Sequence, residues 1–96
     1  MKFEKVLCVC GSGLGSSFLV QMNVEKILKK IGVEDVEVAH SAATDVYKGV
    51  ADLFVIGKDM YDICSPYGDC IVLESIISLP ELEKKLSAYL SEKGVI

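Results

Sequence analysis

The sequence predicts an α/β protein built on a four-stranded parallel sheet with helices on both faces. Short blocks in which every residue is apolar recur along the chain, as they do in strands that are buried on both sides. Between these blocks lie segments whose apolar residues recur at helical spacing, so that strands and helices alternate. With right-handed crossovers the expected strand order is 2-1-3-4, which describes a flavodoxin-like or Rossmann-like three-layer sandwich.

The first half of the chain contains two predicted strands and a long helix. Residues 6–9 are apolar throughout and run into a glycine-rich stretch, which predicts a strand that ends in a tight loop. Apolar residues at helical spacing predict a helix over residues 16–31, with Gly32 as its stop. Residues 36–39 alternate and are rich in valine, which predicts the second strand, with His40 at its exit.

The second half contains the two remaining strands and the last helix. A short helix is expected over residues 44–50. Apolar blocks at residues 53–56 and 71–73 predict the third and fourth strands. Residues 78–81 read Ser-Leu-Pro-Glu, a capping box with proline in the first turn, and the helix that follows is expected to end near Gly94.

Composition limits the class of protein. A chain of 96 residues that is 51% hydrophobic predicts a single domain over residues 1–96. The net charge of -4, without a cluster of lysines, argues against a nucleic-acid partner. Because no apolar stretch approaches the roughly 18 residues that span a bilayer, membrane insertion is not expected. The first residues lack the basic, apolar and small-residue zones of a secretion signal. We therefore expect a cytoplasmic protein whose cysteines are free thiols.

A glycine-serine loop after the first strand is predicted to bind phosphate. It consists of Cys10, Gly11, Ser12, Gly13, Leu14, Gly15, Ser16 and Ser17. Three glycines allow successive main-chain N–H groups to converge on an anion, and the start of the following helix adds unpaired donors. The serine hydroxyls are further candidate donors. Since the loop has no basic side chain, these neutral groups must meet the charge of the phosphate.

Cys10 is the predicted catalytic nucleophile. Donors that stabilise a phosphate also stabilise a thiolate, so we expect its pKa to be depressed. A thiolate at this position can accept a phosphoryl group and pass it on. In the predicted strand order, Cys10 lies where the order of the strands reverses, which is where open parallel sheets bind ligands.

The other cysteines are interpreted as packing residues. Cys8 lies inside the first strand, and Cys64 and Cys70 flank a turn-rich stretch before the fourth strand. A zinc site that combines all four cysteines would need spacings unlike those of paired zinc knuckles, and no metal or organic cofactor is implied. His40 and Lys58 are expected at the same sheet edge as the loop, without a catalytic role.

Residues 6–17 read Val-Leu-Cys-Val-Cys-Gly-Ser-Gly-Leu-Gly-Ser-Ser. They resemble the active-site loop of IIB components of the bacterial phosphoenolpyruvate-dependent sugar phosphotransferase system, and the likeness continues through residues 22–28. The pattern Cys-Gly-x-Gly-x-Gly-Ser-Ser is most similar to the ascorbate branch of the galactitol/ascorbate group, and mannitol-type IIB domains share its ending.

The resemblance implies a single phosphotransferase IIB domain that acts as a relay. A phosphohistidine on a IIA protein would give its phosphoryl group to Cys10. Cys10 would then pass the group to a sugar, ascorbate or a related sugar or polyol, bound by a membrane IIC transporter.

Three other interpretations are open. A low-molecular-weight phosphatase also forms a phosphocysteine, but it needs an arginine six positions after the nucleophile, where this chain has Ser16 and no arginine anywhere. A thiol redox or metal-binding module would use Cys8 and Cys10 together, which requires that both sulfurs be accessible. In a pure interaction domain the loop would be structural only.

Overall fold

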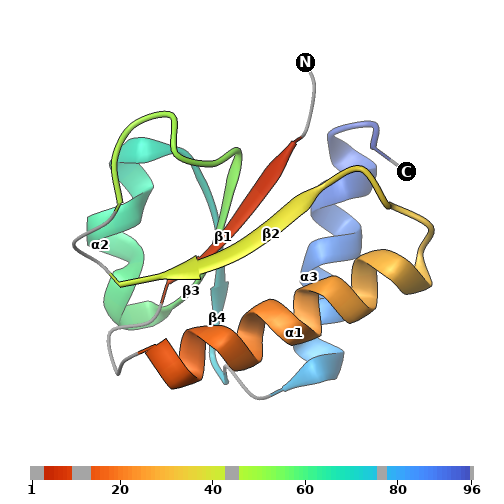
Figure 1. Ribbon diagram of the computed structural model, residues 1–96, viewed down its shortest axis with the longest axis horizontal. Helices are drawn as coiled ribbons and strands as arrows, with labels where there is room; N and C mark the ends of the chain where they lie inside the picture. The colour runs from red at the N-terminus through yellow and green to blue at the C-terminus, as the bar shows by residue number, and fades with distance from the viewer. Residues whose placement is uncertain (1–3, 10–13, 43–45, 76–77, 96) are drawn as a thin grey trace.

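The computed structural model describes residues 4–9, 14–42, 46–75 and 78–95, with only the backbone described at residues 14–16 (Figure 1). Its regular elements are β1 (Lys5–Val9), α1 (Leu14–Lys30), β2 (Glu37–Ser41), β3 (Leu53–Gly57), α2 (Tyr61–Cys64), β4 (Asp69–Leu73) and α3 (Leu79–Glu92). Two 3-10 turns flank α2, at Lys58–Met60 and Ser65–Tyr67. Within these residues, no helix has both the length and the apolar character that crossing a membrane requires.

The four strands form one parallel sheet in the order β2-β1-β3-β4, which confirms the predicted fold class and topology. In this sheet Cys8 of β1 is paired in register with His40 of β2 on one side and with Val55 of β3 on the other. β2 extends to Ser41, so His40 lies within the strand and not after it.

β1 and β3 form the buried centre of the sheet. The side chains of residues 6–9 are at most 3% exposed, and those of residues 53–56 at most 1%. Cys8 packs in a core formed with α1 and α3, whereas its neighbour Leu7 packs in a second core formed with the segment around α2. Figure 1 shows α1 and α3 together on one side of the sheet and α2 on the other. The three layers predicted from the continuous apolar blocks are therefore present.

Helix α1 ends as the sequence predicts. Val33 N–H donates to the Leu28 carbonyl at 2.8 Å, and Gly32 N–H donates to the Lys29 carbonyl at 3.3 Å. This pair of bonds is a Schellman motif, which needs a left-handed residue at Gly32, and its φ is +84°. The helix begins at Leu14, before the predicted start.

Helix α3 is joined to the end of β4 by Glu81. Ser78 Oγ accepts a hydrogen bond from Glu81 N–H at 3.4 Å, as in the predicted capping box. The Glu81 carboxylate, however, does not return to Ser78, because it accepts hydrogen bonds from Glu74 N–H at 2.8 Å and Ser75 N–H at 3.0 Å. Glu81 therefore fixes the position of α3 relative to the carboxyl end of β4.

Lys85 extends this link to the edge strand. Its Nζ donates to Glu81 Oε2 and to the Val72 carbonyl, both at 2.7 Å. The hydrogen bond from Lys85, with those from the main chain of Glu74 and Ser75, lowers the pKa of Glu81 to about 2. The charged carboxylate is thus favoured in the folded state.

The segment before β3 differs from the prediction. The short helix expected over residues 44–50 is wrong in the described part of that segment, and its first two residues lie outside the described part. The segment ends in a turn in which Val50 N–H donates to the Tyr47 carbonyl at 3.2 Å. Gly49 has a φ of +90°, which an α-helix cannot include. Val46 and Val50 pack on the second core without helical structure between them.

The sequence did not predict helix α2. Only Met60 and Cys64 are buried in this segment, so its apolar pattern covers a single helical turn. Pro66 and Gly68 follow closely, and both residues are typical of turns. A short helix supported by two core contacts leaves little periodicity in the sequence.

We expect Glu81→Gln to lower the free energy of unfolding at pH 7. The folded-state pKa of Glu81, about 2, lies below the ordinary value of 4.5, so its stabilising effect is complete above pH 4.5 and is lost as the pH falls toward 2. Urea unfolding between pH 7 and pH 3 measures this, with Glu25→Gln on the exposed face of α1 as the control. A difference from the parent that stays constant across this range would contradict the expectation.

Candidate active site

Two described elements flank the predicted phosphate-binding loop. β1 ends at Val9 and α1 begins at Leu14, so residues 14–17 of the predicted loop belong to the start of the helix, and residues 10–13 connect it to the carboxyl end of a buried central strand. Cys10 and residues 11–13 lie outside the described part of the chain, and their arrangement stays a prediction. The order β2-β1-β3-β4 reverses beside β1, at the position where ligands bind in open parallel sheets.

The amino end of α1 is suited to binding an anion. Leu14, Gly15 and Ser16 form the first turn, where a helix leaves its main-chain N–H groups without a carbonyl one turn earlier. The first turn contains no acidic side chain, and the first charged residue along the helix is Glu25. No carboxylate of the helix therefore offsets the positive end of its dipole near the loop.

Ser17 is held by a neighbouring strand. Its side chain is completely buried, and its Oγ lies 3.3 Å from Nδ1 of His40, which belongs to β2. The ring of Phe18, the next residue of α1, lies 5.4 Å from the His40 ring between centroids. Ser17 was predicted as a phosphate donor, and His40 was given no role. The structure brings the two together at the start of α1.

The three described cysteines are poor candidates for a nucleophile. Cys8 and Cys64 are completely buried. Burial raises the pKa of the Cys64 thiol. Burial, with the nearby Cys64 and Asp69, raises the pKa of Cys70 to about 11. Because the thiolate is the reactive form, a raised pKa suppresses reactivity at neutral pH. The prediction that these cysteines serve in packing agrees with their surroundings.

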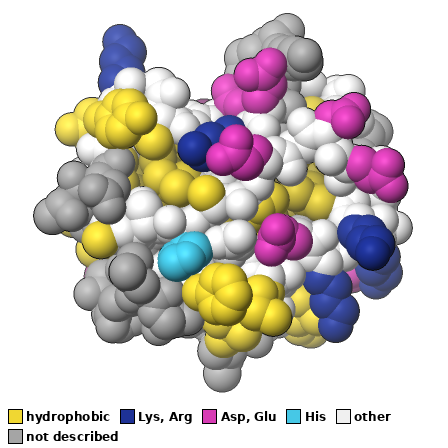
Figure 2. All heavy atoms as spheres, viewed as in Figure 1, with side chains coloured by type: hydrophobic (Ala, Val, Ile, Leu, Met, Phe, Trp, Pro, Cys, Tyr) yellow, Lys and Arg dark blue, Asp and Glu magenta, His cyan; other side chains and the backbone are white. Residues whose placement is uncertain are grey.

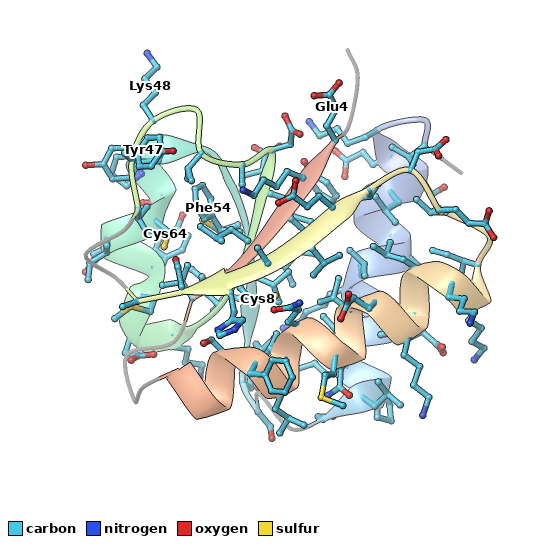
Figure 3. All side chains as sticks on the ribbon, in the orientation of Figure 1. Glu4, Cys8, Tyr47, Lys48, Phe54 and Cys64 are labelled. Atoms are coloured by element: carbon cyan, nitrogen blue, oxygen red, sulfur yellow. The ribbon has the colours of Figure 1, made fainter. Side chains whose placement is uncertain are left out.

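A zinc site that combines all four cysteines does not fit the fold. Cys8 belongs to the core on the α1 side of the sheet, whereas Cys64 belongs to the core on the α2 side (Figure 3). Two thiols on opposite faces of a sheet cannot share one tetrahedral ion. Elsewhere in the described ranges, no three His, Cys, Asp or Glu side chains gather as metal ligands.

An apolar surface lies next to the start of α1. We call it the α1 patch, and it consists of Phe18, Leu19 and Met22, whose side chains are 49%, 39% and 50% exposed. Figure 2 shows hydrophobic side chains gathered over α1 beside the histidine. The sequence contained a signal for this patch, because these three residues lie off the stripe of Val20 and Val24 that faces the core. Large apolar residues off the buried stripe often mark a protein interface.

Lys58 and Glu74 follow β3 and β4 at the same edge of the sheet. Their side chains form an exposed ion pair, with 3.5 Å between Nζ and Oε1. Exposed pairs of this kind contribute little to stability. We assign Lys58 no role in the candidate site.

Comparison with known proteins gives the family. A family model described as the lactose/cellobiose specific IIB subunit of the PTS system, the phosphotransferase system, matches residues 5–88, from β1 into α3. No curated protein matches the chain. IIB subunits are phosphotransferases that relay phosphoryl groups in sugar uptake and interact with IIA and IIC components. The match covers most of the chain, and we conclude that this protein belongs to the lactose/cellobiose specific IIB subunit family of the phosphotransferase system.

Proposed function

We propose that this chain carries the relayed phosphoryl group on Cys10, receives it from a phosphohistidine of a IIA protein, and delivers it to a sugar bound by a membrane IIC transporter. The observation that carries this proposal is the amino end of α1. It directly follows the cysteine-containing loop, and it presents main-chain donors with no carboxylate before Glu25. Such an end stabilises first a thiolate and then a phosphate on the same sulfur.

Two displacements at phosphorus make up the proposed relay. In the first, the Cys10 thiolate attacks the phosphorus of the phosphohistidine, so that an S–P bond forms and the P–N bond breaks. The electron pair stays on the imidazole nitrogen, which takes up a proton from solvent. In the second, a sugar hydroxyl oxygen attacks the phosphorus, the S–P bond breaks, and the electron pair returns to sulfur. The hydroxyl proton leaves to a base of IIC or to solvent.

The rival interpretations lack residues that they need. A phosphatase of the low-molecular-weight class clamps its transition state with an arginine, and this chain has none. A redox pair of Cys8 and Cys10 needs two accessible sulfurs, whereas Cys8 is completely buried in the core. Among the four cysteines, Cys10 is thus the best candidate for phosphorylation.

The residue pattern of the loop narrows the class of sugar that we propose as the substrate. The description of the matching family names lactose and cellobiose. The Cys-Gly-x-Gly-x-Gly-Ser-Ser pattern of residues 10–17, however, resembles the ascorbate branch. We therefore propose ascorbate or a related sugar or polyol as the cargo of the cognate IIC transporter.

The α1 patch is proposed to dock the IIA donor. It begins at Phe18, the residue that follows the predicted loop, so a protein seated on the patch would lie beside the amino end of α1. The patch has no charged side chain, whereas later residues of α1, such as Lys29 and Lys30, are charged. An apolar centre with charges at its margin is typical of protein interfaces.

The direct test is phosphorylation of the purified chain. With the general phosphotransferase proteins, phosphoenolpyruvate and a IIA protein, mass spectrometry should show one added phosphoryl group. The group should be absent in Cys10→Ala and retained in Cys70→Ala, the control. Parallel reactions with IIA proteins of the ascorbate, lactose/cellobiose and mannitol types should be fastest with the ascorbate type. Labelling that persists in Cys10→Ala would refute the proposal.

Thiol reactivity provides a test without partners. We expect iodoacetamide to alkylate Cys10 first, because Cys8 and Cys64 are buried and the pKa of Cys70 is raised to about 11. The pH profile of this alkylation should have its midpoint below the ordinary thiol value of about 8.5. The chain unfolded in urea serves as the control, in which all four cysteines should react. A midpoint for Cys10 at or above the ordinary value would count against a stabilised thiolate.

Met22→Ser tests the docking surface. Removal of a half-exposed apolar side chain from an interface weakens binding by about 1 kcal/mol, so the IIA concentration for half-maximal phosphorylation should rise roughly 5-fold. The maximal rate should not change. Ile63→Ser on α2, where the side chain is 40% exposed, is the matched control. Equal effects of the two substitutions would place the docking surface elsewhere.

A further inference from the structure

His40 makes two contacts with consecutive residues of α1. Its Nδ1 lies 3.3 Å from the hydroxyl oxygen of Ser17, and its ring lies 5.4 Å from that of Phe18, with an angle of 58° between the ring planes. His40 is paired in register with Cys8, whose side chain packs on the α1 side of the sheet. The imidazole therefore joins the carboxyl end of β2 to the beginning of α1.

Of the two residues in this contact, Ser17 is the more constrained by its surroundings. Ser17 is completely buried, and a buried hydroxyl that loses a hydrogen bond destabilises the arrangement around it. Ser17 directly follows Leu14, Gly15 and Ser16, whose main-chain N–H groups are the proposed anion donors. A contact that fixes Ser17 against β2 also fixes the direction in which these donors point.

We propose that His40 is a positioning residue for phosphorylation of Cys10, which acts by holding Ser17 and Phe18 so that the first turn of α1 stays aimed at the loop. This inference rests on the proposed function of Cys10. His40 does not touch the phosphoryl group in this role. Thiolate attack on a phosphohistidine needs no proton from the IIB chain, so a donor of protons is not required at His40.

Four variants and one control test the role. The variants are His40→Ala, His40→Asn, Ser17→Ala and the double variant of His40→Ala with Ser17→Ala. The control is Ser41→Ala, because Ser41 is the next residue of β2 and its hydroxyl donates to the Ala42 carbonyl at 3.3 Å, not to α1. Each chain is phosphorylated by an excess of phosphorylated IIA in a single turnover at several IIA concentrations. The pH midpoint of Cys10 alkylation is measured in parallel.

Loss of the contact between His40 and Ser17 should slow the chemical step. His40→Ala and Ser17→Ala should each lower the maximal rate roughly 10-fold, as expected for one lost hydrogen bond that orients the site. In Ser17→Ala, which keeps the contact between His40 and Phe18 of the α1 patch, the half-saturating IIA concentration should stay unchanged. In both variants the alkylation midpoint should rise toward that of an ordinary thiol. The double variant should be no slower than either single one, because both remove the same link. His40→Asn, whose amide can reach the position of Nδ1, should recover most of the rate.

The outcomes separate this inference from the proposed function. If Cys10 is phosphorylated but neither His40→Ala nor Ser17→Ala changes the maximal rate or the alkylation midpoint, the positioning role is overturned and the relay stands. An additive double variant would show that His40 and Ser17 act independently and would also overturn the positioning role. So would a failure of His40→Asn to recover the rate. If no IIA protein phosphorylates Cys10, the relay fails, and the alkylation midpoints still decide the role of His40. Should His40→Ala not fold, His40→Phe, which keeps a ring beside Phe18 and removes the ring nitrogens, decides: an unchanged maximal rate and alkylation midpoint would overturn the role.

Discussion

Burial of β1 and β3 on both faces is the constraint on which the rest of the structure depends. Their side chains are almost entirely inaccessible, so apolar layers must cover the sheet from two sides. α1 and α3 supply one layer, and the segment around α2 supplies the other. β1 is a central strand, and its carboxyl end at Val9 lies beside the point where the strand order reverses.

The candidate site inherits its geometry from this arrangement. The helix that follows β1 must pack back over the sheet, and its amino end therefore lies at the edge where β1 ends. Because α1 covers β2 as well as β1, a residue of β2 can contact the first turns of the helix, and His40 does so. In the proposed relay, main-chain donors at the start of α1 would bind the anion, and the contact with β2 would support their position.

Sequence patterns were sufficient to predict the sheet and its strand order. A fully apolar block followed by apolar residues at helical spacing strongly predicts a buried strand followed by a helix. They were also sufficient for the end of α1, since Gly32 meets a specific need for a left-handed residue. They failed for α2, whose core contacts are limited to Met60 and Cys64. They also failed for the contact of His40 with Ser17, because these residues are distant in the sequence and become neighbours only when β2 pairs with β1. The loop around Cys10 was recognised from its residues, and its conformation stays a prediction.

The edge of the sheet at β4 shows how the fold limits unwanted association. An edge strand exposes main-chain groups that a strand of another molecule can pair with, which is a common start of aggregation. Here Lys85 Nζ donates to the Val72 carbonyl at 2.7 Å and places a charged amine along that edge. An incoming strand would have to displace this amine and break its hydrogen bond with the Val72 carbonyl. The charged amine at this carbonyl thereby makes the β4 edge a less ready template for pairing with another copy of the chain.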